Sequence, residues 1–96
     1  MLTPLWLAAE WGRLELARML IEHGALIDIS SYEDETPLHQ ASEHGYIDVV
    51  RLLLENGADL GARNKAGMTP SDVASSEGQQ EVVRLLFECG QKSFKG

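Results

Sequence analysis

The chain contains three histidines, His23, His39 and His44, which are the side chains best suited to metal binding or acid–base catalysis. His39 and His44 are five residues apart, so they do not share a helix face, which requires a spacing of three or four residues. Glu43 follows His39 by four residues, but two ligands do not make a zinc site. The spacing therefore predicts no metal site, and we expect His39 to be a structural residue.

Two other features are candidates for chemistry. The single cysteine, Cys89, has no base beside it in the sequence, so we expect a half-exposed residue at a helix end rather than a catalytic thiol. The acidic run at 33–35 lacks the alternating ligand spacing of a calcium loop. We expect it to form a solvated loop tip. The sequence therefore predicts no catalytic residue, no metal ligand and no cofactor.

Length and charge narrow the class of protein. A chain of 96 residues forms one small domain at most. The net charge of −7 disfavours nucleic acid and anionic membrane surfaces, both of which attract clustered Lys and Arg. No apolar run approaches the roughly 20 residues that span a bilayer. A single cysteine gives no disulfide framework within the chain, which fits a reducing environment, so we expect an intracellular protein, cytoplasmic or nuclear.

The elements that position these residues recur along the chain. Thr3-Pro4-Leu5 returns as Thr36-Pro37-Leu38 and, in part, as Thr69-Pro70, an interval of 33 residues. The same interval relates glycines in two series: Gly12, Gly45 and Gly78, and Gly24, Gly57 and Gly90. A fixed period of this length indicates stacked supersecondary units rather than one closed globule. We therefore look for function on a long surface and not in a pocket.

The second unit shows what each repeat contains. Thr36 is a good N-cap and Pro37 a good first helical residue, and Gly45 ends this first helix. The run Val49–Leu54 predicts a second, strongly apolar helix, and Gly57 follows its last turn in the usual place for a left-handed cap. Polar and turn residues then predict a hairpin-like connection. Each unit is thus a helix, a turn, a second helix and a hairpin loop.

This unit resembles the ankyrin repeat. The likeness rests on Thr36-Pro37-Leu38-His39, Ala41, Gly45, the Val49–Leu54 run and Gly57-Ala58-Asp59, and it covers Leu2 to about Gly90. It implies an all-α solenoid, an L-shaped stack of helix-turn-helix pairs with short β-hairpin loops at right angles. We expect a single domain over residues 1–96, with repeats at about 3–35, 36–68 and 69–96.

Several positions depart from the pattern. The resemblance implies that His39 hydrogen-bonds near Thr36 and ties adjacent repeats together, whereas Trp6 takes its place in repeat one and cannot accept a hydrogen bond in the same way. Asp34 stands where Gly67 stands in the second loop. Because Asp adopts the left-handed conformation less readily than Gly, we expect a less regular first loop. After Gly90 we expect a frayed polar tail.

The resemblance implies a protein-binding module without catalysis. Partners of ankyrin-repeat domains usually contact the hairpin tips and the exposed ends of the first helices. Carried over by position, the candidate partner-binding residues are Glu10, Trp11, Tyr32, Glu33, Glu35, Glu43, His44, Lys65, Met68 and Glu77. Trp11 and Tyr32 belong to types enriched in binding hot spots. The surrounding carboxylates predict a protein partner that carries Lys or Arg beside an apolar residue.

An alternative is a fragment or an engineered repeat scaffold, an assembly unit without a partner of its own. The outward face of repeat one is expected to include apolar side chains without a polar cap, namely Leu5, Ala9, Leu16 and Leu20. Solenoids normally protect their terminal faces. We therefore expect either further repeats before this one or end-to-end self-association through the uncapped N-terminal repeat.

Overall fold

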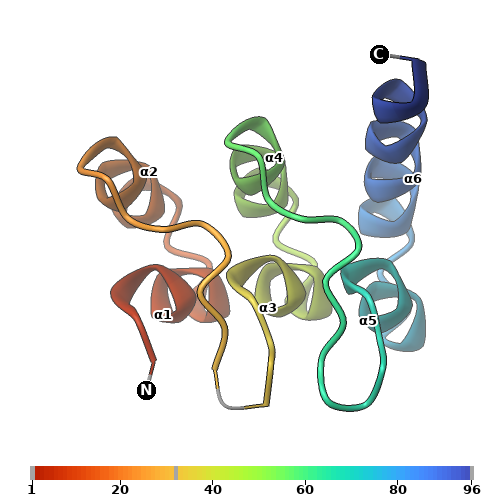
Figure 1. The fold of residues 1–96 in the computed structure, drawn as a ribbon, viewed down its shortest axis with the longest axis horizontal. Helices are drawn as coiled ribbons and strands as arrows, with labels where there is room; N and C mark the ends of the chain where they lie inside the picture. Colours follow the sequence, from red (N-terminus) through yellow and green to blue (C-terminus); the bar gives the residue numbers. More distant parts are fainter. Residues whose placement is uncertain (1, 32, 96) are drawn as a thin grey trace.

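The fold is known from a computed structural model that describes residues 2–31 and 33–95, with side chains described up to residue 91. The helices of this range are α1 (Pro4–Trp11), α2 (Leu14–Glu22), α3 (Pro37–His44), α4 (Ile47–Glu55), α5 (Pro70–Ser76) and α6 (Gln80–Lys95). They form three antiparallel pairs that stand side by side (Figure 1). The first helix of each pair lies in one layer and the second helix in another. This arrangement confirms the predicted stack of helix-turn-helix units.

The first helices begin as the sequence predicts. The hydroxyls of Thr3, Thr36 and Thr69 cap them by accepting hydrogen bonds from backbone N–H groups three residues later, at 3.1, 3.3 and 3.2 Å. A proline follows each threonine as the first helical residue, where its missing N–H costs nothing. These contacts are local, so the recurrence of Thr-Pro alone is enough to place each helix start.

The core is one continuous cluster that runs through all three helix pairs. Small side chains line the first helices, where Ala8, Ala41 and Ala74 are at most 1% exposed and allow α1, α3 and α5 to lie close together. The second helices contribute larger residues such as Val50 and Leu53, both fully buried. Burying one such side chain contributes roughly 1.5–3 kcal/mol before entropy costs. Each repeat therefore depends on its neighbour for a buried core.

The first connecting loop is as regular as the second, so the expectation of irregularity was wrong. Asp34 adopts the left-handed conformation at φ 61°, close to the 79° of Gly67. The amide N–H groups of Ser31 and Asn64 donate to the carbonyls four residues later, Glu35 and Met68, at 2.9 and 3.0 Å. The Ser31 hydroxyl replaces the Asn64 carboxamide as acceptor for two loop amides, and these bonds hold Asp34 in place.

Both loops turn as hairpins, although residues 2–31 and 33–95 contain no β-strand. The loops are also joined to each other, because the Lys65 amide N–H donates to the Glu33 carbonyl at 3.0 Å. Figure 1 shows the two tips side by side below the helices. The two hairpins are therefore joined into one continuous layer that projects from the two layers of helices.

The last helix departs from the 33-residue pattern. Gly90 lies inside α6, which continues to Lys95, so the expected helix end at Gly90 and the frayed tail beyond it were wrong. Gly24 and Gly57 adopt the left-handed conformation at φ 93° and 89°. Gly90 keeps the helical backbone, and the chain continues as helix. None of the helices in the described range is long and apolar enough to span a bilayer.

Candidate functional site

His39 is fully buried and uses both ring nitrogens for structure. Its Nδ1 accepts a hydrogen bond from the Thr36 backbone N–H at 3.1 Å. The proton must therefore be on Nε2, which donates to the Met68 carbonyl at 2.9 Å. The imidazole thus closes the N-terminus of α3 and ties it to the second loop. Neither nitrogen is available to bind a metal or to serve as a base.

Trp6 makes the same tie between repeats by another route, so the expectation that it could not replace His39 was only half right. Its indole N–H donates to the Glu35 carbonyl at 2.7 Å, and Glu35 is the first-loop equivalent of Met68. What Trp6 lacks is an acceptor for the Thr3 N–H. The inter-repeat bond needs only a ring N–H at the right distance, and indole supplies it as well as imidazole.

Glu35 lies at the centre of a polar network that the sequence did not reveal. Its carboxylate accepts hydrogen bonds from the side-chain amides of Gln40 and Asn64, the latter at 3.2 Å. Both amides are buried, at 5% and 9% exposure. The network joins the first loop, α3 and the second loop. Its only sequence signal was the alignment of Asn64 with Ser31, which marks a loop-stabilising position but not the partner.

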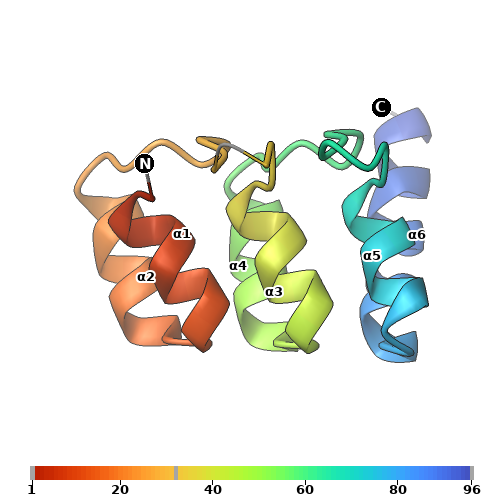
Figure 2. The ribbon, with the colours of Figure 1, turned by 90° about the horizontal axis from the view of Figure 1, so that it is seen from below.

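The predicted partner-binding residues separate into two bands. Along the loop tips lie Glu33, Glu35, Lys65 and Met68, and along the turns between paired helices lie Glu10, Trp11, Glu43, His44 and Glu77. Figure 2 shows the loops along the top of the molecule and the turns along the bottom. A first helix of eight residues separates the bands by about 12 Å at 1.5 Å per residue. Tyr32 lies outside the described residues.

Trp11 is the most exposed member of the turn band, at 67%. The residues that occupy its position in the other repeats are His44 and Glu77, and both are exposed as well. All three repeats therefore expose this position. Next to it, the Tyr46 ring lies against Gly12 and faces the His44 ring at 5.5 Å between centroids. The turn edge therefore carries a row of aromatic side chains from the first two repeats.

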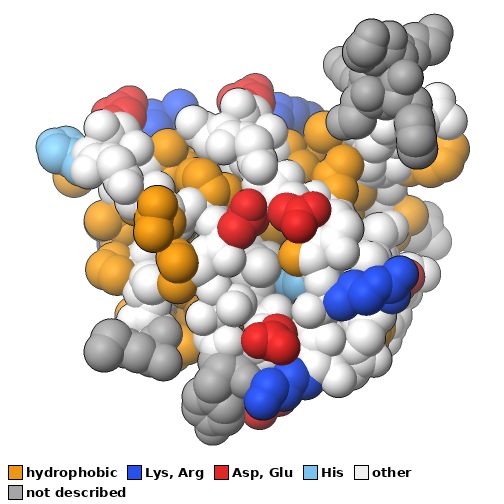
Figure 3. Space-filling view, viewed as in Figure 1, with side chains coloured by type: hydrophobic (Ala, Val, Ile, Leu, Met, Phe, Trp, Pro, Cys, Tyr) orange, Lys and Arg blue, Asp and Glu red, His pale blue; other side chains and the backbone are white. Residues whose placement is uncertain are grey.

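Exposed apolar side chains are concentrated in the first repeat and its loop. In the view of Figure 3, hydrophobic side chains gather on the left, over the N-terminal helix pair. Leu26 is 68% exposed, where the second loop has Asp59. No sequence pattern marked Leu26 as a surface residue of interest, because the resemblance placed contacts only at the loop tips and helix ends.

The exposed end face of repeat one differs from the one expected. Leu5 and Ala9 are buried at 1% and 0%, and Leu20 is half-buried. The side chains that reach the surface are Leu7, Leu16 and Met19, at 39%, 41% and 55% exposure. Leu5 and Ala9 face inward because α1 packs against α2 and α3.

One carboxyl among the described groups has a clearly shifted pKa. The backbone N–H of Thr69, and then its hydroxyl, hydrogen-bond to Asp72, and with a smaller contribution from the Arg63 charge they lower the Asp72 pKa. The carboxylate forms a capping box at the start of α5. The described residues contain no group of three His, Cys, Asp or Glu side chains that could hold a metal ion.

The stack of helix pairs, its inter-repeat ties and its exposed edge define a helical repeat protein. A family model described as ankyrin repeats, in three copies, matches residues 1–64. This match covers two thirds of the chain, which therefore belongs to the ankyrin-repeat family. Such repeats generally serve as protein-interaction modules and are typically not catalytic. A search of curated proteins found no match.

Proposed function

We propose that this chain is an intracellular interaction module that binds a protein partner through the face of its first helices and its loop tips, without catalysing a reaction. The observation that supports it is the exposure of Trp11, 67% at a position that is exposed in all three repeats. A large aromatic ring in water gains free energy when a partner covers it. Trp11 is the proposed anchor.

The charges around this anchor select the partner. Glu10 and Glu43 follow the turn edge at the same repeat position, Glu77 lies one position further on in repeat three, and the chain as a whole carries a charge of −7. A partner with Lys or Arg beside an apolar residue would place the cation near these carboxylates and the apolar group on Trp11. Glu33, Lys65 and Met68 offer a second contact at the loop tips, whereas Glu35 already shares its carboxylate with Gln40 and Asn64.

The proposal also includes contact between copies of the chain. The exposed Leu7, Leu16 and Met19 form an apolar end face on repeat one. An apolar face of this kind marks an interaction site on a folded protein. It is separate from the turn edge that carries Trp11, so the two contacts can be tested independently.

The test is substitution of the anchor. Partners are captured from cell lysate with the wild-type chain, identified, and titrated against the wild type and Trp11→Ala. We expect the variant to bind at least about 2 kcal/mol more weakly, roughly 30-fold in affinity. Leu26→Ala is the matched control, because Leu26 is equally exposed at 68% but lies away from the turn edge. Unchanged affinity of Trp11→Ala would contradict the assignment of the anchor.

A further inference from the structure

Repeat one exposes side chains whose equivalents the other repeats bury. Leu16 and Met19 of α2 are 41% and 55% exposed, whereas Val49 and Leu52, which occupy the same positions in α4, are 1% and 7% exposed. In α4 these positions are covered because α4 packs on α2. The end face of repeat one therefore has the shape and chemistry of a surface that normally lies against another repeat.

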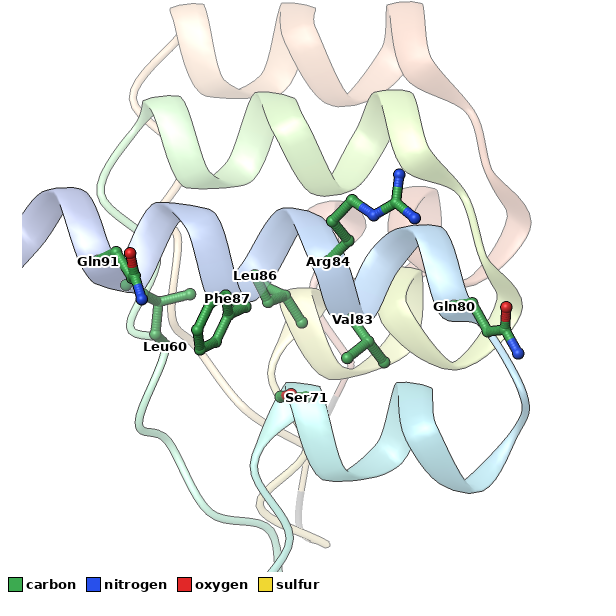
Figure 4. A pocket seen from close by; sticks show the side chains of 9 residues that line it. Leu60, Ser71, Gln80, Val83, Arg84, Leu86, Phe87 and Gln91 are labelled. Atoms are coloured by element: carbon green, nitrogen blue, oxygen red, sulfur yellow. The ribbon is translucent and has the colours of Figure 1, made fainter.

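The opposite end of the stack has a complementary apolar groove of about 640 Å³. Figure 4 shows Val83, Leu86 and Phe87 extending from α6 toward Ser71 of α5, with Leu60 beside the Phe87 ring. Phe87 is 64% exposed, whereas its equivalents in the other repeats are half-buried. This groove occupies the position at which α2 and α4 each receive the next helix pair.

Charged side chains on the second helices are also matched between neighbouring repeats. Arg18 shares a surface groove with Asp48 and Glu55 of the next helix pair. Arg51 in turn shares one with Glu81 and Glu88. In each case the arginine of one repeat lies beside two carboxylates of the following repeat, together with the arginine of that following repeat.

Arg84 continues this series and lies at the rim of the terminal groove, where no helix of the described residues follows α6. The carboxylates equivalent to Asp48 and Glu55 are Glu15 and Glu22, which are exposed on α2 at the other end of the stack. The two ends of the molecule thus match in apolar character and in the placement of charge.

We infer that the end face of repeat one docks into the α5–α6 groove of a second copy, head to tail. In this register Leu16 and Met19 face Val83 and Phe87, and Arg84 lies between Glu15 and Glu22 of the next copy. The inference rests on the proposed contact between copies. It adds which surface of the second copy is bound and which residues face each other.

Two features set the strength of this contact. Ser71 and Gln80 line the groove where the first two repeats have leucine or isoleucine, so the contact buries less apolar area than the interfaces within the chain. The net charge of −7 opposes association, although salt at about 0.15 M screens it beyond about 8 Å. Because the two surfaces differ, association is open-ended and grows with concentration.

The test is sedimentation velocity of the full chain at concentrations up to about 1 mM. We expect the average mass of the wild type to rise with concentration. Met19→Asp removes only the end face and Phe87→Asp only the groove, so each variant alone should associate at least about tenfold more weakly. Mixed together they should form a one-to-one dimer, because each retains the surface that the other lacks. Circular dichroism confirms that both variants are folded.

Three results would overturn the inference: a wild type that remains monomeric, a Phe87→Asp variant that dimerises alone, or a mixture that fails to pair. The second result would indicate contact between two end faces of repeat one. The register has its own test, since Arg84→Glu should weaken association and a partner carrying Glu15→Arg and Glu22→Arg should restore it. Trp11→Ala should leave association unchanged, which separates this contact from binding of a different protein.

Discussion

Ser42 lies fully buried in α3, and its hydroxyl has no hydrogen-bond partner among the described residues. A buried hydroxyl without a partner loses its hydration and gains nothing in return. The equivalent position in repeat one is Ala9, which is also fully buried, so the site accommodates a methyl group.

We therefore expect Ser42→Ala to stabilise the fold, by about 1 kcal/mol. The measurement is the midpoint and slope of urea unfolding followed by circular dichroism. Ser75, which occupies this position in repeat three, is exposed, and Ser75→Ala should change stability little. Loss of stability in Ser42→Ala would show that the hydroxyl has a partner in solution.

The turns between paired helices depend on glycine for two reasons. Gly12 and Gly78 both have positive φ angles, 68° and 74°. At Gly12 a Cβ atom would also lie 2.9 Å from the Tyr46 ring of the next repeat, whereas at Gly78 it would meet no described atom within 4 Å. An L-residue would therefore be strained at this turn in every repeat. A neighbouring side chain would obstruct its Cβ atom only where another repeat follows.

We expect Gly78→Ala to cost about 1–2 kcal/mol, the penalty for the left-handed conformation. Gly12→Ala should cost about 1–3 kcal/mol more, because the aromatic ring must move. Both values come from urea denaturation under the same conditions. Equal losses of stability in the two variants would mean that the Tyr46 ring moves aside at no cost in free energy.

The cap of α5 should make stability depend on pH. The Asp72 pKa is lowered in the folded state, so its carboxylate stabilises the fold above the unfolded-state pKa of about 3.9. This contribution is lost as the pH falls through the folded-state pKa. We expect Asp72→Ala to be less stable than the wild type at pH 7, with the difference disappearing in strong acid. A difference that does not shrink as the pH is lowered would rule out the carboxylate as its source.

On the scale of the whole molecule, each helix pair packs only on the pairs next to it, through α1, α3 and α5 in one layer and α2, α4 and α6 in the other. The middle repeat therefore supports both ends. Leu53 of α4 is fully buried, while Leu20, its equivalent in α2, is only half-buried. Stability in such a stack is approximately a sum of repeat and interface terms.

We expect Leu53→Ala to cost about 2–5 kcal/mol and to weaken both interfaces together. Leu20→Ala should cost less, because α2 has a neighbour on one side only. Thermal and urea unfolding of the two variants gives the comparison. Equal losses would show that the repeats are not coupled as their contacts indicate.

Much of the fold was predictable from the sequence because its signals are local. A Thr-Pro cap, a glycine in a left-handed turn and an apolar helix each act within about five residues, so their recurrence predicted the start of each first helix and the stack of helix pairs. The candidate site was predictable only in part. Trp11 proved exposed as expected, but the Glu35 network with Gln40 and Asn64 joins residues far apart in the chain, and no local pattern announces it.

The sequence by itself determined the repeat unit, the helix caps and the family. The tertiary structure decided which of three equivalent positions is covered. Leu16, Val49 and Val82 occupy the same place in their repeats, yet only Leu16 reaches the surface, because burial depends on the repeat that lies before it. It also decided that Trp6 can replace His39 as the hydrogen-bond donor between repeats. The two residues that this bond joins are 29 apart in the sequence, so the bond depends on how neighbouring repeats are placed.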